Sequence, residues 1–303
     1  MPKRMSDEEI ACESSFRENT RRASHGRFIV SMPLKQPPQC LGESQAQTIN
    51  RFYSTERKLA KNPKLKERYV EFMGECEKSG HMSLVENNVG NIEYFMPHHG
   101  VVREESKTTK LRVVFDASAP STNGISLNNI QRVGPVLQDD LFSILLRFRK
   151  RTYVISADIA KMYRQVLIEP GQRCLQKIIW RPNPSEALKM YSLNTVTYGQ
   201  ACASFLAIRC IFELVRECEA NKPKIADIIR RNFYVDDLLT GADTAMEALQ
   251  IANDVYKVLK SGSFELRKWY SNQPDIIKNL AGGTDCGILE FASDENTKTL
   301  GLI

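Results

Sequence analysis

Apolar residues recur at helical or strand spacing along most of the chain, and turn residues separate the runs. Helical spacing predicts helices over 54–78, 138–149, 204–221 and 244–260. Thr244 and Glu247 add a capping-box signal to the last one. Runs of β-branched and aromatic residues predict strands at 93–96, 111–115, 153–157, 177–180, 191–194 and 233–235. Interleaved helices and strands indicate a mixed α/β or α+β architecture rather than a helix bundle or a β-sandwich.

Residues 1–48 lack this sustained periodicity and are mixed and polar. The Lys35-Gln36-Pro37-Pro38 stretch is typical of a linker. Within the same segment, residues 28–34 alternate and could pair as an edge strand. The pattern therefore predicts a linker over 1–48, followed by a folded region over 49–303.

Composition places the chain among folded proteins, because 42% of its 303 residues are hydrophobic and 26% are charged. Its length suggests about two domains or one elongated domain with subdomains. A net charge of +6 is compatible with a polyanionic partner but is also common in ordinary enzymes. No apolar run reaches the roughly 18 residues that a membrane span needs, and no signal peptide follows Met1. We therefore expect an intracellular, cytoplasmic protein with no membrane partner.

Cysteine and histidine spacing does not predict a zinc site, because the eight cysteines form no C-x-x-C pair and only His98 and His99 are adjacent. Cys202, Cys210 and Cys218 recur every eight residues in a predicted helix. They are either a thiol cluster or small hydrophobic core positions.

Acidic residues follow two of the predicted strands. Asp236 and Asp237 lie between two runs of strand composition, which predicts a tight hairpin with both carboxylates at its tip. Asp158 ends another apolar strand. If these strands pair in one sheet, three carboxylates converge, an arrangement that is unfavourable unless a cation binds there.

Carboxylate oxygens are hard ligands that suit Mg²⁺, which also takes phosphate oxygens from a substrate. Two such ions can activate a 3′-hydroxyl and stabilise a departing pyrophosphate. The three acids therefore predict nucleotide addition with two Mg²⁺ ions, for which Mn²⁺ can substitute. The alternative is that Asp236 and Asp237 form only a common turn.

Tyr234-Val235-Asp236-Asp237 is the YxDD box of reverse transcriptases. The segments 101–129, 133–168, 196–209 and 232–250 resemble, in order, the Pol polyprotein of BEL/Pao long-terminal-repeat retrotransposons. The resemblance covers about residues 50 to 303. It implies an α+β right-hand polymerase fold with fingers, an antiparallel palm sheet backed by helices, and a truncated thumb that begins at 299–303. Residues 1–48 then correspond to the linker that precedes the polymerase.

The same resemblance assigns roles to individual residues. Asp158 and Asp236 correspond to the two catalytic, metal-binding aspartates, and Asp237 to the supporting acid of the box. Tyr163 corresponds to an aromatic steric gate against the ribose 2′-hydroxyl, because a rigid ring there selects deoxynucleotides. Its alternative role is a core tyrosine.

Other carried-over positions concern the incoming nucleotide. Arg112 and Lys110 correspond to the basic residues that meet the triphosphate, although Lys110 could equally belong to a solvated face. Tyr198 and Gly199 stand where many relatives have Gln-Gly beside the nucleotide and template. Tyr234 of the box is a further substrate contact.

Basic residues near the nucleic acid are the least specific signal. Lys268 matches a lysine that protonates pyrophosphate, with plain solvent exposure as the alternative. The cluster Arg147, Arg149, Lys150 and Arg151 suits a phosphate backbone, with the solvated end of a helix as the alternative.

The resemblance implies an RNA-directed DNA polymerase whose partners are an RNA or DNA template with its primer, deoxynucleoside triphosphates, and the thumb, connection and RNase H regions of a polyprotein. Virus-like particles are an alternative location. Ser204 stands where proline is usual. This departure favours the second candidate function, an inactive remnant that at most binds nucleic acid. A viral RNA-dependent RNA polymerase is disfavoured because such enzymes place an acid at the position of Tyr163.

Overall fold

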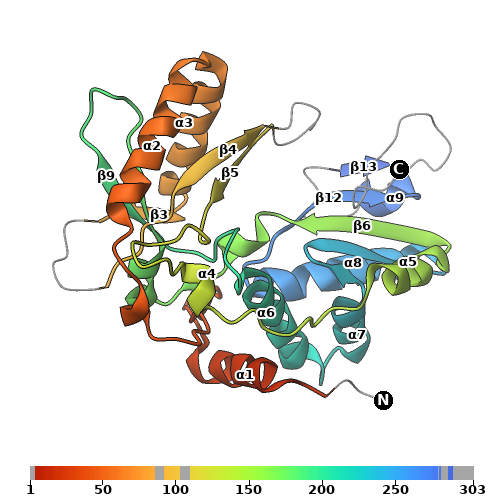
Figure 1. The fold of residues 1–303 in the computed structure, drawn as a ribbon. Helices are drawn as coiled ribbons and strands as arrows, with labels where there is room; N and C mark the ends of the chain where they lie inside the picture. Colours follow the sequence, from red (N-terminus) through yellow and green to blue (C-terminus); the bar gives the residue numbers. More distant parts are fainter. Residues whose placement is uncertain (1–3, 86–91, 103–109, 279, 281–285, 289–303) are drawn as a thin grey trace. The chain divides into compact units, whose positions relative to one another are not determined.

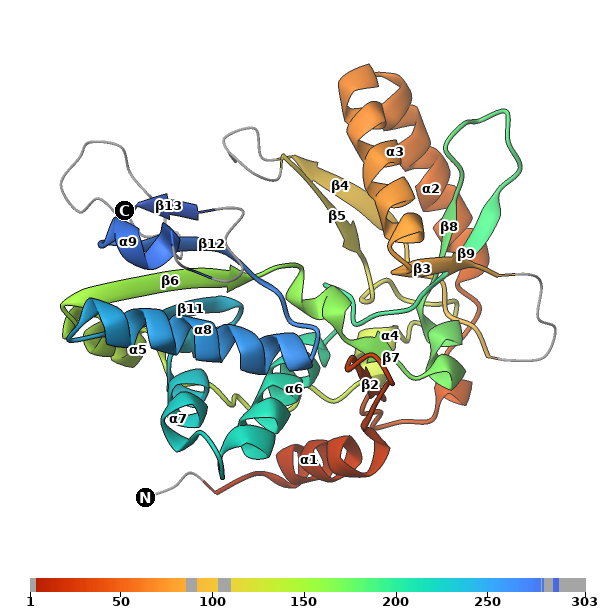
Figure 2. The ribbon, with the colours of Figure 1, turned by 180° about the vertical axis from the view of Figure 1, so that it is seen from behind.

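The computed structural model describes residues 4–85, 92–102, 110–278, 280 and 286–288, and its residues fall into two compact units. Unit 1 comprises residues 1–21, 29–135 and 166–206, and unit 2 comprises residues 22–28, 136–165 and 207–303. Figures 1 and 2 show the chain from opposite sides. The segment 299–303, where the sequence predicts the start of a thumb, lies outside the described residues.

Unit 2 is built on a five-stranded sheet with the order β10-β11-β6-β12-β13. The strands are β10 (Phe233–Tyr234), β11 (Asp237–Ala242), β6 (Tyr153–Ile159), β12 (Leu266–Ser271) and β13 (Cys286–Ile288). The first four pair antiparallel, and β13 pairs parallel to β12. The strand predicted at 153–157 is therefore the central one, and it continues through Asp158.

Helices α5 (Leu141–Arg149) and α8 (Ala245–Ser261) pack on this sheet, and α7 (Pro223–Arg231) contacts α8 (Figure 2). Thr244 caps α8 by accepting a hydrogen bond from the amide of Glu247 at 3.3 Å. The buried stripe of α8 includes Ile251, Val255 and Leu259, and each such side chain contributes roughly 1.5–3 kcal/mol when fully buried. The described residues after position 200 also form helix α6 (Ala203–Cys218) and the short α9 (Pro274–Lys278).

Unit 1 contains two antiparallel sheets beside a helix pair. The strands β3 (Met82–Leu84), β9 (Lys189–Leu193) and β8 (Lys177–Trp180) form one sheet, and β4 (His98–Val102) and β5 (Leu111–Phe115) form the other. Helices α2 (Gln45–Ala60) and α3 (Pro63–Lys78) lie side by side and contact these strands (Figure 1). The smaller elements of the chain are α1 (Asp7–Asn19), β1 (Arg21–Arg22), β2 (Phe28–Val30), η1 (Pro38–Cys40), α4 (Leu127–Ile130), η2 (Met162–Gln165), β7 (Leu167–Ile168) and η3 (Pro170–Gln176). Of these, η2 belongs to unit 2.

Two predicted elements differ in the structure. The single helix expected over 54–78 is two helices, because Asn62 caps the second by accepting from the amide of Leu65 at 3.1 Å and Pro63 occupies its first turn. The strand expected at 93–96 is only an isolated bridge between Phe95 and Lys177. The neighbouring β4 takes its place as the partner of β5.

Regular structure also occurs in the segment 1–48, where the sequence predicts a linker. Helix α1 begins with a capping box between Ser6 and Glu9. It buries Cys12 and Phe16, and the Phe16 ring meets that of Phe205 edge-on at 6.3 Å. The strand expected within 28–34 forms as β2, but it is not an edge strand, because it lies between β1 and β7 in a three-stranded sheet.

The described cysteines are free thiols, and Cys202 and Cys210 are fully buried whereas Cys218 is partly exposed. Burial raises the pKa of the Cys202 thiol to about 12. The two buried thiols therefore behave as hydrophobic core positions. Among the described residues, no helix combines the length and the apolar character of a membrane span.

Candidate active site

The predicted hairpin forms, but only Asp236 lies at its tip, because Asp237 begins β11. Tyr234 of β10 pairs with Asp237 of β11, so Val235 and Asp236 make a two-residue turn. Val235 has a φ of +55°, a conformation that is unusual for a β-branched residue and is stable only when its surroundings enforce it. The strained residue of the turn is therefore Val235, which directly precedes Asp236.

Two strands of the sheet bring the acids together. Asp237 lies directly opposite Asp158 in the β11–β6 register, and directly opposite residues share one face with Cβ atoms about 5 Å apart. The carbonyl of Asp236 accepts a hydrogen bond from the amide of Ile159 at 2.8 Å. All three predicted carboxylate residues are thus fixed at one end of the sheet.

This proximity changes the acidity of Asp237. Partial burial, together with the charges of Asp236 and Asp158, raises the pKa of the Asp237 carboxyl to about 7, while the ammonium of Lys268 acts in the opposite direction. A second cation beside the cluster would relieve the same repulsion.

Lys268 contributes the one cation whose contact with these acids is described. It lies in an irregular stretch of β12, at a φ of +48°, and its Nζ lies 2.7 Å from Oδ2 of Asp158. Partial burial acts to lower the pKa of Lys268, but the hydrogen bond and charge of Asp158 raise it overall. Neither sequence-based alternative for Lys268, pyrophosphate protonation or plain exposure, predicts this ion pair.

The donor set fits a magnesium ion. Asp158, Asp236 and Asp237 offer only hard carboxylate oxygens. The other oxygen of Asp158, Oδ1, is buried and has no hydrogen-bond partner, which is costly unless a ligand completes it. In the described part of the chain, no three His, Cys, Asp or Glu side chains lie close enough together to bind a metal ion without moving. A cation would therefore have to draw the carboxylates together and compete with Lys268.

The remaining predicted residues of unit 2 lie around this sheet. Tyr163, in the 3₁₀ turn after β6, is only 7% exposed, whereas Tyr234 is 37% exposed. Within the basic cluster, Arg147 pairs with Asp139 at 2.8 Å and Arg151 pairs with Asp243 at 3.2 Å. The described residues provide no ion pair for Arg149 or Lys150, which are exposed. The structure therefore gives half of the cluster intramolecular partners.

Four predicted nucleotide contacts belong to unit 1. Arg112 is exposed on β5, Lys110 is exposed just before that strand, and Tyr198 is 45% exposed. Gly199 has a φ of +97°, and a methyl group there would overlap the carbonyl oxygen of Phe115. Only glycine fits this position without strain.

Two side-chain amides organise these turns. Leu127-Asn128 resembles the Leu-Asn that closes the fingers motif, but the sequence predicts the contacts of neither Asn128 nor Gln138. Asn128 donates to the carbonyl of Gly199 at 2.8 Å and accepts from the amide of Ala201 at 2.9 Å. Gln138 contacts both backbone polar groups of Val235, with its Oε1 2.8 Å from the amide nitrogen and its Nε2 3.3 Å from the carbonyl oxygen. Periodicity does not detect such contacts, because they depend on which loops meet.

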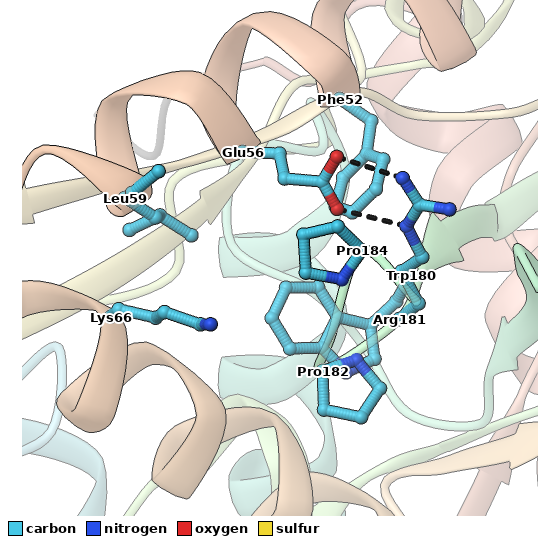
Figure 3. Close-up of a pocket in the computed structure, with 9 residues that line it drawn as sticks. Phe52, Glu56, Leu59, Lys66, Trp180, Arg181, Pro182 and Pro184 are labelled. Carbon is cyan, nitrogen blue, oxygen red and sulfur yellow. Dashed lines mark hydrogen bonds and ion pairs between the residues drawn. The ribbon is translucent and has the colours of Figure 1, made fainter. Parts of the chain in front are cut away.

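A pocket on unit 1 lies apart from all the predicted site residues. Its lining includes Phe52, Glu56, Trp180 and Arg181. Figure 3 shows the guanidinium of Arg181 paired with Glu56 through two contacts, each 2.8 Å long. This pair joins α2 to the end of β8, so its evident role is structural.

Comparison with solved structures gives the fold. A foamy viral protease-reverse transcriptase in complex with an RNA/DNA hybrid superposes with a TM-score of 0.51 and 16% identity over 68% of this chain. A mutant of the prototype foamy virus protease-reverse transcriptase gives 0.50 and 20% identity, also over 68%. The chain spans about a quarter of each, 24% of their length. No protein-family model matches the chain, and no curated protein sequence does. The mixed helix-and-sheet structure is therefore similar to that of a reverse transcriptase.

Proposed function

We propose that the chain is the fingers and palm of an RNA-directed DNA polymerase, a reverse transcriptase of the BEL/Pao type. The observation that carries the proposal is the pairing of Asp158 with Asp237 across two antiparallel strands, with Asp236 in the adjoining turn. The reverse transcriptase-like fold supports it. In this proposal unit 2 is the palm and unit 1 contributes the fingers.

The proposed reaction joins the primer 3′-oxygen to the α-phosphorus of a deoxynucleoside triphosphate. The 3′-hydroxyl loses its proton, the α–β phosphoanhydride bond breaks, and pyrophosphate leaves. Asp158, Asp236 and Asp237 would hold two Mg²⁺ ions, or Mn²⁺ in their place. When bound, these ions would favour ionisation of the 3′-hydroxyl and neutralise charge on the leaving group.

Other residues would position the substrates. The basic side chains of Arg112 and Lys110 would bind the triphosphate, because guanidinium and ammonium groups suit phosphate oxygens. The buried ring of Tyr163 would exclude a 2′-hydroxyl, and Tyr198 with Gly199 would lie beside the nucleotide and template. The partners would be an RNA or DNA template with its primer. The thumb, connection and RNase H regions of the polyprotein would complete the enzyme.

A second candidate function is an inactive remnant that binds nucleic acid. One observation favours it: the ammonium of Lys268 already pairs with the carboxylate of Asp158. The two candidates share a fold and differ in whether the acids support catalysis.

Incorporation of labelled deoxynucleotide on poly(rA)/oligo(dT) with Mg²⁺ separates the candidates. The chain would be compared with an Asp236→Asn, Asp237→Asn double variant and with Asp275→Asn, a matched control at an acid that is 71% exposed on α9. Extension that is lost in the double variant and retained in the control supports the polymerase. Primer-template binding without extension, also after thumb residues are added, supports the remnant.

A further inference from the structure

Gln138 lies in the segment just before α5, and its side chain contacts the turn of the Asp-Asp hairpin. Its side-chain amide accepts from the backbone N–H of Val235 at 2.8 Å and donates to the carbonyl of Val235 at 3.3 Å. One side chain thus satisfies both polar groups of the residue that precedes Asp236, in the way that a neighbouring strand would.

We propose that Gln138 is a positioning residue of the active site: it fixes the Val235–Asp236 turn and thereby the carboxylate of Asp236 relative to Asp158. The inference rests on the proposed polymerase function and identifies a residue that acts through another. Gln138 itself is not assigned any contact with substrate.

The turn requires such support. A β-branched residue at a φ of +55° is strained and persists only where surrounding contacts enforce it. Val235 occupies one of only two positions between β10 and β11, so relaxation of its backbone would rotate the adjoining peptide of Asp236. That residue is also tied to β6, because its carbonyl accepts from the amide of Ile159.

Gln138 is itself held in place, which a positioning residue must be. The next residue, Asp139, pairs with Arg147 at 2.8 Å, and Asp140 caps α5 by accepting from the amide of Ser143 at 2.9 Å. These contacts tie the two residues after Gln138 to α5, Asp140 to its first turn and Asp139 to its last turn.

Arg147, the partner of Asp139, also contacts the other end of the hairpin. Nε of Arg147 donates to Oδ1 of Asn232 at 3.2 Å, and the amide of Asn232 donates to Oγ1 of Thr240 at 3.1 Å. We call Gln138, Asp139 and Arg147 the α5 brace. It contacts the hairpin at its turn through Gln138 and at its base through Arg147, so α5 and the hairpin behave as one rigid piece.

The brace predicts a specific kinetic signature. Loss of Gln138 leaves the metal-binding acids and nucleotide contacts present but lets Asp236 move, and small misplacements of a reacting group cost up to about 100-fold in rate. We expect Gln138→Met, which keeps the side-chain length and removes both polar groups, to lower kcat by roughly 10- to 100-fold, with KM for the deoxynucleotide within about threefold.

Amide hydrogen exchange tests the structural part independently of catalysis. In Gln138→Met the amide of Val235 should exchange at least about 10-fold faster, while amides of β6 and β12 keep their protection. Gln138→Glu retains the acceptor for the Val235 amide and should show intermediate protection. Gln250→Met is the matched control, since Gln250 on α8 also makes a side-chain bond, to Asp254 at 2.7 Å, away from the hairpin.

Hydrogen exchange and kinetics together separate failure of the Gln138 inference from failure of the proposed polymerase function. If the unaltered chain extends no primer, faster exchange at Val235 still supports the positioning role, and the function fails separately. Unchanged exchange at Val235 together with unchanged kcat in Gln138→Met overturns the inference. A fall in kcat that Gln250→Met reproduces, or global loss of protection, would also overturn it, because Gln138 would then act only on stability.

Discussion

Lys268 occupies one oxygen of the carboxylate that the proposed chemistry needs. Its Nζ lies 2.7 Å from Oδ2 of Asp158, so a divalent cation at Asp158 must overcome both this ion pair and the nearby positive charge. A partly exposed pair of this kind is worth about 0.5–1 kcal/mol. Lys268 would therefore weaken the proposed metal binding in the absence of nucleotide.

Replacing Lys268 tests this competition. Lys268→Met should tighten Mg²⁺ binding by about threefold to fivefold, corresponding to the free energy of the lost pair. The measurement is the Mg²⁺ concentration that gives half of the metal-dependent rise in Tm. Lys278→Met is the control, because Lys278 pairs with Asp275 on exposed α9. An unchanged or weaker Mg²⁺ midpoint in Lys268→Met would show that the ammonium does not compete.

Glycine at position 199 tests the turn that carries Tyr198. With a φ of +97° and the carbonyl of Phe115 against its α-carbon, Gly199→Ala should lower the free energy of unfolding by about 2 kcal/mol or more. Gly74 of α3 has no atom within 4 Å of an added methyl group, so Gly74→Ala should instead stabilise by about 0.5–1 kcal/mol. Urea denaturation measures both. Equal effects would mean that the turn relaxes around the methyl group.

At the scale of residues, the sequence identifies the three acids but not the contacts that Lys268 and Gln138 make around them. Asp158 follows a strand, and Asp236 with Asp237 ends a hairpin, so local patterns predict their convergence. The contacts of Lys268 and Gln138 depend on a strand irregularity and on the meeting of two distant loops. Neither feature leaves a periodic signal.

At the scale of elements, runs of β-branched and aromatic residues predict β5 and β8 with their observed bounds. Helix α1 is missed because only Cys12 and Phe16 of its 13 residues are buried, too few to establish a 3.6-residue period. The break between α2 and α3 is signalled by Asn62-Pro63, a cap followed by an N1 proline. These two residues by themselves predict two helices in place of one.

His98, the first residue of β4, links several elements of unit 1. Its Nε2 donates to the carbonyl of Ile179 at 2.8 Å, so Nδ1 accepts from the hydroxyl of Tyr69 at 2.6 Å. The rings of Phe52, Phe115 and Trp180 surround it. Burial lowers the pKa of His98 to about 4, so the folded protein keeps this ring neutral.

Stability should therefore depend on His98 between pH 6.5 and 4. The unfolded chain takes up a proton near its ordinary pKa of 6.5 and the folded chain does not, so stability is complete above pH 6.5 and falls as the pH approaches 4. Between pH 7 and pH 5 the loss should be about 2 kcal/mol. Urea denaturation of the unaltered chain and of His98→Gln, compared at both pH values, measures it. An equal pH dependence in the two proteins would exclude His98 as the source.

At the scale of the whole molecule, a net charge of +6 is too general to define a nucleic-acid surface. The structure separates the four basic residues near the end of α5 into two pairs. Arg147 and Arg151 have carboxylate partners. Arg149 and Lys150 are exposed and have no ion pair among the described residues. If the end of α5 binds a phosphate backbone, the second pair of residues carries that binding.

Salt dependence distinguishes a local contact from overall charge. Each phosphate contact adds about one unit to the slope of log Kd against log salt concentration, because binding releases counterions. The Arg149→Gln, Lys150→Gln variant should reduce this slope by about two for an RNA/DNA duplex, measured by fluorescence anisotropy over a KCl series. Lys61→Gln, Lys64→Gln removes the same charge from exposed positions near the α2–α3 junction and should leave the slope nearly unchanged. Equal reductions of the slope in the two double variants would indicate a general charge effect. If neither variant reduced the slope, Arg149 and Lys150 would be only the solvated end of a helix, where the macrodipole favours cations.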